Sequence, residues 1–283
     1  MTRPAPVPIT SSLQADLLRR WLPARPRAAH KGDFGPLAVI GGDVGHSGAV
    51  LLTGETALRA GAGVTAVGCA PETAAGLWIA RPELMARALR EREDLAALLT
   101  FARALVIGPG LGQGPWAQRL WPHLAEAAAP QVMDADGLNW LAREPYRHER
   151  RILTPHPGEA ARLLGCSIAD IQADRAGAVV ALVDRYGGVV ILKGAGTLIS
   201  DGERCWRCEA GNPGMATPGM GDVLAGLTGA LLAQQLPLFE AAALAADLHA
   251  RAGDLAARAG ERGLLASDLW LPLRQLVNPG AET

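Results

Sequence analysis

A glycine-rich run opens an apolar helical segment and places an acid in its first turn. The run Gly211–Asp222 reads GNPGMATPGMGD, and the apolar stretch Val223–Leu232 follows directly. Free N–H groups and the helix dipole favour an anion at such a start, and glycines let the chain approach it closely. We expect the same field to keep Asp222 ionised and able to act as a general base. The run predicts a phosphate site with a proton acceptor, although such loops also serve only to pack a helix on a strand.

The elements that must position this loop are short apolar runs bounded by glycine or proline, with helical stretches between most of them. The runs are Leu37–Ile40, Val64–Val67, Ala104–Ile107, Gln131–Met133, Arg151–Leu153 and Val189–Leu192. This alternation predicts an α/β fold with a mainly parallel central sheet and helices on both faces. Two further strands, Thr197–Ser200 and Arg204–Glu209, predict a small antiparallel hairpin, and the chain is helical after Asp222.

Polar and glycine-rich segments follow the predicted strands one after another. They are Gly41–Asp43, Gly108–Gly112, Asp134–Gly137, Thr154–Glu159 and Lys193–Thr197. In such sheets ligands collect at the carboxyl ends of the strands. We therefore expect one rim that combines glycines with two acidic clusters, a histidine and a lysine. Asp134 and Asp136 would share a face on a continuing strand, or bond only to backbone as turn residues.

Composition sets the limits of the function. The chain has 283 residues, 49% hydrophobic content and a net charge of -1, which predicts one domain without attraction to nucleic acid or anionic lipid. We find no apolar span of membrane length and no signal-like core in residues 1–12, so we expect a cytoplasmic protein. Cys205 and Cys208 have the spacing of half a zinc site, but on a strand their thiols would point to opposite faces.

Six ordered motifs resemble the NAD(P)H-hydrate dehydratase family, a branch of the ribokinase-like fold. They are His30–Gly35, Gly108–Gly112, Asp134–Asn139, Thr154–Glu159, Lys193–Thr197 and Gly211–Thr217. The resemblance extends from residue 30 to about residue 272 and implies a three-layer fold. It also implies that ADP or ATP phosphorylates the C6 hydroxyl of the S epimer of hydrated NADH or NADPH. Loss of phosphate then restores the nicotinamide ring.

The resemblance also implies roles for individual residues. The catalytic acid that contacts the hydrate hydroxyl would be Asp222. Residues implied to contact the hydrated dinucleotide are Ala49, Gly110, Gly112 and His156. Residues implied to bind the adenine nucleotide are Lys193, Gly194, Ala195, Gly196, Thr197, Gly219 and Gly221. Mg²⁺ is the expected cofactor.

Several of these residues have simpler alternatives. His156 lies between two prolines, so it could instead make a packing or turn contact, and Lys193 could cap a strand end rather than neutralise phosphate. Glu159 is either an ordinary first-turn acid of the next helix or holds magnesium through water. Pro218 and Met220 stand where family members usually carry a small residue and a hydroxyl residue. We therefore expect altered nucleotide affinity.

Two other functions fit the same residues. One is a small-molecule kinase, for instance of a vitamin precursor alcohol, and the other is a nucleotide-binding protein without turnover. We expect residues 1–29 to form an extension with a short helix and residues 30–283 to form one catalytic domain. Family members often carry an epimerase domain, for which this chain has no room. The terminal helices are alanine-rich, and members of the family often assemble as tetramers. Both features predict a homo-oligomer, such as a tetramer.

Overall fold

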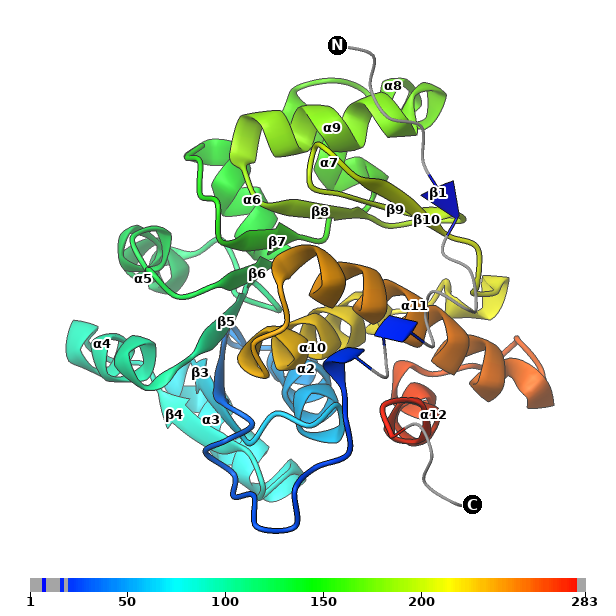
Figure 1. The fold of residues 1–283 in the computed structure, drawn as a ribbon. Coiled ribbons are helices and arrows are strands. Elements are labelled where there is room, and N and C mark those ends of the chain that lie inside the picture. Colours follow the sequence, from blue (N-terminus) through cyan, green and yellow to red (C-terminus); the bar gives the residue numbers. More distant parts are fainter. Residues whose placement is uncertain (1–6, 9–15, 18–19, 279–283) are drawn as a thin grey trace.

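The computed structural model describes residues 7–8, 16–17 and 20–278, which build one ten-stranded sheet in the order β1-β10-β9-β8-β7-β6-β5-β2-β3-β4 (Figure 1). The strands are β1 (Val7–Pro8), β2 (Pro36–Ile40), β3 (Val64–Cys69), β4 (Met85–Ala88), β5 (Ala104–Ile107), β6 (Gln131–Met133), β7 (Arg151–Leu153), β8 (Val189–Leu192), β9 (Thr197–Ser200) and β10 (Cys205–Cys208). Every neighbouring pair is parallel except that β9 runs antiparallel to β8 and β10. The mainly parallel sheet and the hairpin are confirmed.

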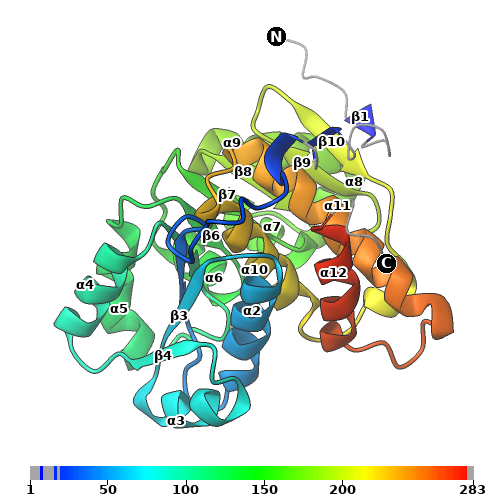
Figure 2. The same ribbon diagram turned by 60° about the horizontal axis from the view of Figure 1, so that its bottom comes forward.

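Helices cover both faces of the sheet and complete the three layers (Figures 1 and 2). One layer contains α2 (Ser47–Arg59), α3 (Pro71–Ala80), α10 (Met220–Ala233), α11 (Leu238–Ala256) and α12 (Trp270–Leu276). The other contains α4 (Arg92–Phe101), α5 (Pro115–Ala125), α6 (Asp136–Arg143), α7 (Pro157–Leu164), α8 (Ile168–Ala173) and α9 (Arg175–Tyr186). Three short 3₁₀ turns are η1 (Pro213–Met215), η2 (Ala257–Ala259) and η3 (Ala266–Leu269).

Alternate residues of each strand enter different cores, because successive side chains of a strand point to opposite faces. In β2, Val39 packs with the α10 layer, whereas Ile40 packs with the α5 layer. Both faces are covered, which explains the continuous apolar runs. The same rule separates the thiols, since Cys205 is buried in the second core and Cys208 in the first. The predicted divergence of these two cysteines is confirmed.

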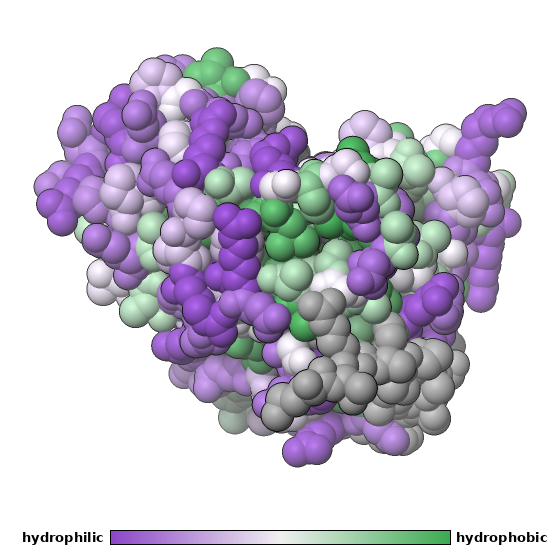
Figure 3. All heavy atoms as spheres, turned by 90° about the horizontal axis from the view of Figure 1, so that it is seen from above, coloured by the Kyte–Doolittle hydropathy of each residue, from purple (hydrophilic) through white to green (hydrophobic). Residues whose placement is uncertain are grey.

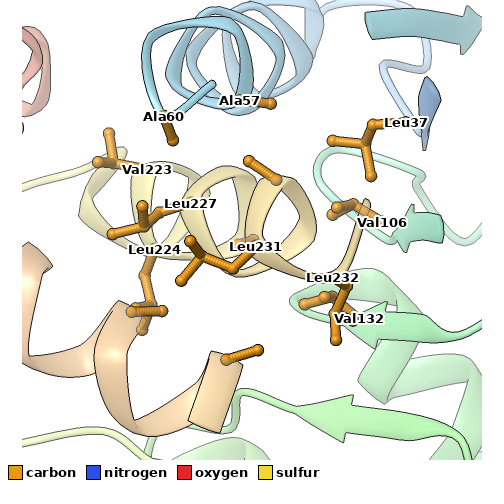
Figure 4. Close-up of a cluster of buried hydrophobic side chains, with 14 of the residues drawn as sticks. Leu37, Ala57, Ala60, Val106, Val132, Val223, Leu224, Leu227, Leu231 and Leu232 are labelled. Atoms are coloured by element: carbon orange, nitrogen blue, oxygen red, sulfur yellow. The ribbon is translucent and has the colours of Figure 1, made fainter. Parts of the chain in front are cut away.

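The helix that follows the glycine-rich loop is the most buried one in the first layer. Figure 4 shows α10 beside α2, with Leu37 of β2, Val106 of β5 and Val132 of β6 near the C-terminal end of the helix. A Cβ on Gly226 would lie 2.2 Å from the carbonyl oxygen of Thr53 in α2, so the two helices touch backbone to backbone. This close contact fixes the position of the α10 N-terminus.

About half of the predicted N-terminal extension of residues 1–29 lies outside the described residues. Of its described part, β1 pairs in parallel with β10 at the edge of the sheet. No helix among the described residues is long and apolar enough to cross a membrane. Viewed from above, the surface is mostly hydrophilic with apolar side chains gathered in a central band (Figure 3).

Candidate active site

An ion pair between a buried carboxylate and a partly buried lysine lies at the carboxyl ends of β6 and β8. Asp134 follows β6 and is 2% exposed, and its Oδ1 accepts from Lys193 Nζ at 2.8 Å and from Thr154 Oγ1 at 2.7 Å. Burial alone would lower the pKa of Lys193, but Asp134, Glu159 and Asp222 together raise it above its ordinary value. The lysine is therefore a fixed cation at the rim. It is held by a carboxylate that is itself oriented by a hydroxyl.

The first turn of α7 supplies a second carboxylate to this lysine. His156 is the N-cap, and its Nδ1 accepts from the backbone N–H groups of Gly158 and Glu159 at 2.9 and 3.3 Å. Glu159 Oε2 accepts in return from the His156 backbone at 2.7 Å and lies 3.7 Å from Lys193 Nζ. Burial raises the pKa of Glu159 to about 7 despite the neighbouring lysine. Within the protein, Glu159 is thus a first-turn acid of α7 and His156 makes a turn contact, which are the simpler alternatives for these two residues.

The N-terminus of α10 lies directly over the ion pair. Gly219 is the helix N-cap with φ of +89°, a left-handed conformation that glycine adopts without strain. A Cβ on Gly221 would lie 3.4 Å from Asp134 Oδ2 and 3.4 Å from Lys193 Nζ. Asp222 is the third residue of the helix and shares this environment. The structure therefore brings together Asp222, Lys193, Asp134 and Glu159, which come from four separate segments.

The expectation that the helix field keeps Asp222 fully ionised is wrong. Burial, reinforced by the Asp134 carboxylate, raises the pKa of Asp222 to about 7, although Lys193 offsets part of the effect. Desolvation and a like charge outweigh the partial charge of a helix terminus. At neutral pH the acid is poised between its two protonation states, which is the condition that suits a general base.

The loops after β2 and β5 form the adjoining part of the rim. A Cβ added to Gly110 would lie 3.3 Å from Ala49 Cβ and 2.7 Å from His46 Cβ. The start of α2 therefore touches this loop. Gly112 donates its N–H to Asp136 Oδ2 at 2.9 Å, and its Cβ position is 2.7 Å from Asp43 Oδ2. Since β5 neighbours β6, these residues continue the edge on which Asp134 stands.

The two aspartates do not share a face, and the alternative that both bond only to backbone holds only in part, since Asp136 accepts from the Gly112 backbone but also from the Gln113 and Asn139 side chains. Strand β6 ends at Met133, Ala135 has φ of +48°, and Asp136 begins α6. The backbone therefore turns between the carboxylates, and they diverge. Asp134 holds Lys193, whereas Asp136 accepts from the Gly112 backbone.

The predicted nucleotide loop Lys193–Thr197 is the turn between β8 and β9, and two arginines flank it. Arg175 donates to the carbonyl oxygens of Leu192 and Lys193 at 3.1 and 3.3 Å. A Cβ on Gly196 would lie 2.6 Å from Arg207 Nε. A pocket of about 210 Å³ lies between the two guanidinium groups and the loop. Sequence reasoning missed both arginines, because each lies in an unremarkable helix or strand position.

The Met220 side chain is buried at 6% exposure among apolar residues of the first core. Residue 220 therefore contributes to the packing under the loop.

The buried carboxylates that could bind magnesium already have partners within the protein. Among the described residues no group of three His, Cys, Asp or Glu side chains is arranged to hold a metal ion. Both Asp134 and Glu159 already face Lys193. Mg²⁺ usually keeps several waters and binds through one or two carboxylates plus substrate phosphates. The residues present do not form a metal cage of their own.

The three-layer architecture, with an acid at the start of a buried helix beside a glycine-rich loop, defines an α/β protein of the ribokinase-like class. Residues 37–273 match the NAD(P)H-hydrate dehydratase family, and the chain belongs to that family.

Individual proteins agree with this assignment. The chain is 51% identical over 260 residues to the bifunctional NAD(P)H-hydrate repair enzyme Nnr of Coxiella burnetii, covering 91% of this chain and 53% of that protein. It is 41% identical over 270 residues to the ADP-dependent (S)-NAD(P)H-hydrate dehydratase of Neisseria meningitidis, covering 90% and 89%. The ADP/ATP-dependent NAD(P)H-hydrate dehydratase of Bacillus subtilis, co-crystallised with ATP/Mg²⁺, superposes with a TM-score of 0.83 at 29% identity, covering 95% and 97%. The chain spans about half the length of the bifunctional relatives.

Proposed function

We propose that the protein converts hydrated NADH or NADPH, in its S form, back to NADH or NADPH at the expense of ADP or ATP. The observation that carries the proposal is the position of Asp222, at the start of α10 beside the partly buried Lys193, with a pKa raised to about 7. The names of the Neisseria and Bacillus relatives support the substrate and the nucleotide.

The proposed reaction has two steps. In the first, the Asp222 carboxylate takes the proton of the C6 hydroxyl, and that oxygen attacks the terminal phosphorus of the nucleotide. The bond from this phosphorus to the bridging oxygen breaks, so ADP leaves as AMP, or ATP as ADP. In the second, the C6–O bond breaks and phosphate leaves with its electron pair. The neighbouring ring carbon gives its proton to the departing phosphate, and the electron pair of that C–H bond forms the C=C bond.

The described residues supply positioning and electrostatic stabilisation, which is how phosphoryl transfer is usually catalysed. The N–H groups at the start of α10, next to Gly219 and Gly221, would face the phosphates, and Lys193 would balance their charge. The loop Gly194–Thr197 would hold the nucleoside. Ala49, Gly110, Gly112 and His156 would line the part of the rim that holds the hydrated dinucleotide, since they continue the same edge.

Magnesium would accompany the nucleotide, bound mainly by its phosphates and by water, with Glu159 as the nearest candidate for a water-mediated contact. The homo-oligomer stays a prediction and takes no support from the alanines of α11, because Ala241–Ala246 pack inside the chain's own core. A cytoplasmic location also stays a prediction.

The test is incubation with hydrated NADH and either ADP or ATP. Recovery of the absorbance of reduced nicotinamide, with release of one phosphate per molecule recovered, supports the proposal. Release of phosphate without recovery, or formation of a stable phosphate ester, would instead favour a kinase. Asp222→Asn should bind ADP but restore the cofactor about 100-fold to 10,000-fold more slowly.

A further inference from the structure

Helix α11 presents a histidine that the proposed reaction does not use. His249 Nε2 is buried and has no hydrogen-bond partner among the described residues. A buried polar atom left unpaired costs about 1–3 kcal/mol, so its presence calls for a partner from outside the chain. The imidazole lies beside the Met220 backbone at the start of α10 and is close enough to Lys193 to feel its charge.

The same face of α11 is fastened to the glycine-rich loop. Asp254 accepts from the Gly211 backbone at 3.0 Å through one oxygen and from Asn212 Nδ2 at 2.9 Å through the other. One turn before Asp254, Ala250 lies 3.7 Å from the Cβ position of Gly211.

Four residues after His249, Gly253 leaves room for Met215, whose sulfur would lie 2.3 Å from a Cβ there. Residues 249, 250, 253 and 254 thus form one helix face that is fixed to the loop. His249 is therefore held in a constant relation to whatever the loop binds.

Electrostatics decide what kind of partner His249 can take. Burial, together with the charge of Lys193, lowers the pKa of His249 to about 4, so the ring is neutral at physiological pH. The Met220 backbone acts in the opposite direction and raises the pKa, as an acceptor beside the ring does. A neutral imidazole that donates through one nitrogen presents the other as an acceptor. Phosphate oxygens at neutral pH are acceptors as well, so they cannot pair with it.

We propose that His249 Nε2 accepts a hydrogen bond from the nucleoside part of the bound adenine nucleotide, either a ribose hydroxyl or the exocyclic amine of the base. The inference rests on the proposed function, which places the nucleotide between the loop Lys193–Thr197 and the start of α10. In this arrangement α11 recognises the nucleoside, whereas the glycine-rich loop and Lys193 bind the phosphates.

The test is calorimetric binding of ADP and of inorganic pyrophosphate, which needs no turnover. His249→Phe fills a similar volume without a ring nitrogen and should bind ADP about fivefold to tenfold more weakly, with pyrophosphate affinity unchanged. His249→Asn keeps an acceptor oxygen and should lose less. Equal loss for ADP and pyrophosphate would mean a displaced phosphate loop and would overturn the proposal, as would unchanged ADP affinity.

Analogues identify the donor and keep the test decisive if a variant does not fold. In the unsubstituted protein, 2′-deoxy-ADP or 3′-deoxy-ADP should bind about fivefold to tenfold more weakly than ADP if a ribose hydroxyl is the donor. IDP should do so if the base amine is the donor. The penalty should vanish in His249→Phe. If no analogue loses affinity, or the penalty persists in the variant, the proposal is refuted; if the unsubstituted protein binds no ADP, the proposed function itself fails.

Discussion

Replacing Asp222 by asparagine should make the protein more stable and less active at the same time. Asparagine has the same shape, but it cannot accept the hydroxyl proton. Loss of a positioned general base lowers the rate by about 100-fold to 10,000-fold. The gain in stability follows from the environment of the carboxylate, which folding removes from water and places near Asp134.

The size and pH dependence of the gain follow from the raised pKa. Because the folded state holds the Asp222 proton more tightly than the unfolded state, stability falls as pH rises from about 4 to about 7 and then levels off. A rise from 3.8 to about 7 is worth at most about 4 kcal/mol, at about 1.4 kcal/mol for each pKa unit. Since the side chain is not fully buried, we expect the advantage of Asp222→Asn to grow by about 2 kcal/mol between pH 5 and pH 8.

The assay is urea unfolding of both proteins at pH 5, 6, 7 and 8, with the free energy of unfolding compared at each pH. Asp170→Asn is the matched control. Hydrogen bonds from Ser167 lower the pKa of the exposed Asp170 carboxyl, so this variant should show no advantage that grows with pH. In parallel, kcat/KM of the unsubstituted enzyme should rise with pH through about 7, as Asp222 becomes ionised.

Two results would refute this reasoning. If the unfolding free energies of the two proteins run parallel from pH 5 to pH 8, Asp222 does not carry a raised pKa. If Asp222→Asn retains the rate of the unsubstituted enzyme, Asp222 is not the base, whatever its pKa.

Three further substitutions test the site and its support. Lys193→Met leaves Asp134 and Glu159 buried without their cation; the free energy of unfolding in urea should fall by about 3–5 kcal/mol at pH 8, and an unchanged value would show that the ion pair does not support the fold. Gly221→Ala places a methyl group 3.4 Å from Lys193 Nζ, where phosphates would approach; the melting temperature should be unchanged while KM for ADP rises about tenfold or more, and an unchanged KM would remove the phosphates from this position. Gly226→Ala would force α10 away from α2 and should cost about 3 kcal/mol in calorimetric melting, whereas Gly76→Ala on α3, with open space around it, should gain up to about 1 kcal/mol; equal effects would contradict the packing argument.

The six central strands could be predicted from the sequence because each is a short apolar run buried on both faces. Strand β4 could not, because its sequence Met85–Ala88 contains an arginine and lies at the sheet edge with Met85 exposed. Edge strands are not buried on both sides, so they leave no continuous apolar pattern. Helix α6 could not be predicted for another reason. Its first turn contains Asp136 and Gly137, which are residues typical of turns.

The position of the candidate site at the sheet edge was predictable, but the protonation state of its carboxylates was not. The order of strands brings the loops after β6, β7 and β8 to one edge, and the motifs in those loops are visible in the sequence. The protonation of Asp222 depends on Asp134, which lies 88 positions earlier in the chain, and on burial, and neither can be read from the helix that contains it. The sequence did not single out His249 either, because it lies in an alanine-rich helix. The residue becomes a candidate only through its unpaired Nε2, which the structure shows.

The small residues of α10 matter to the proposed chemistry as much as the acid at its start. Gly226 meets the Thr53 carbonyl oxygen, and a Cβ on Gly229 would lie 2.3 Å from Val106 Cγ2 of β5. These two positions set the height of the helix above the sheet, and the helix in turn sets the distance between Asp222 and Lys193. A larger residue at either position would lift α10 and weaken the electrostatic coupling that places the acid near neutral pH. The geometry of the proposed active site is therefore encoded one and two turns away from Asp222, in residues that sequence reasoning treats only as part of an apolar helix.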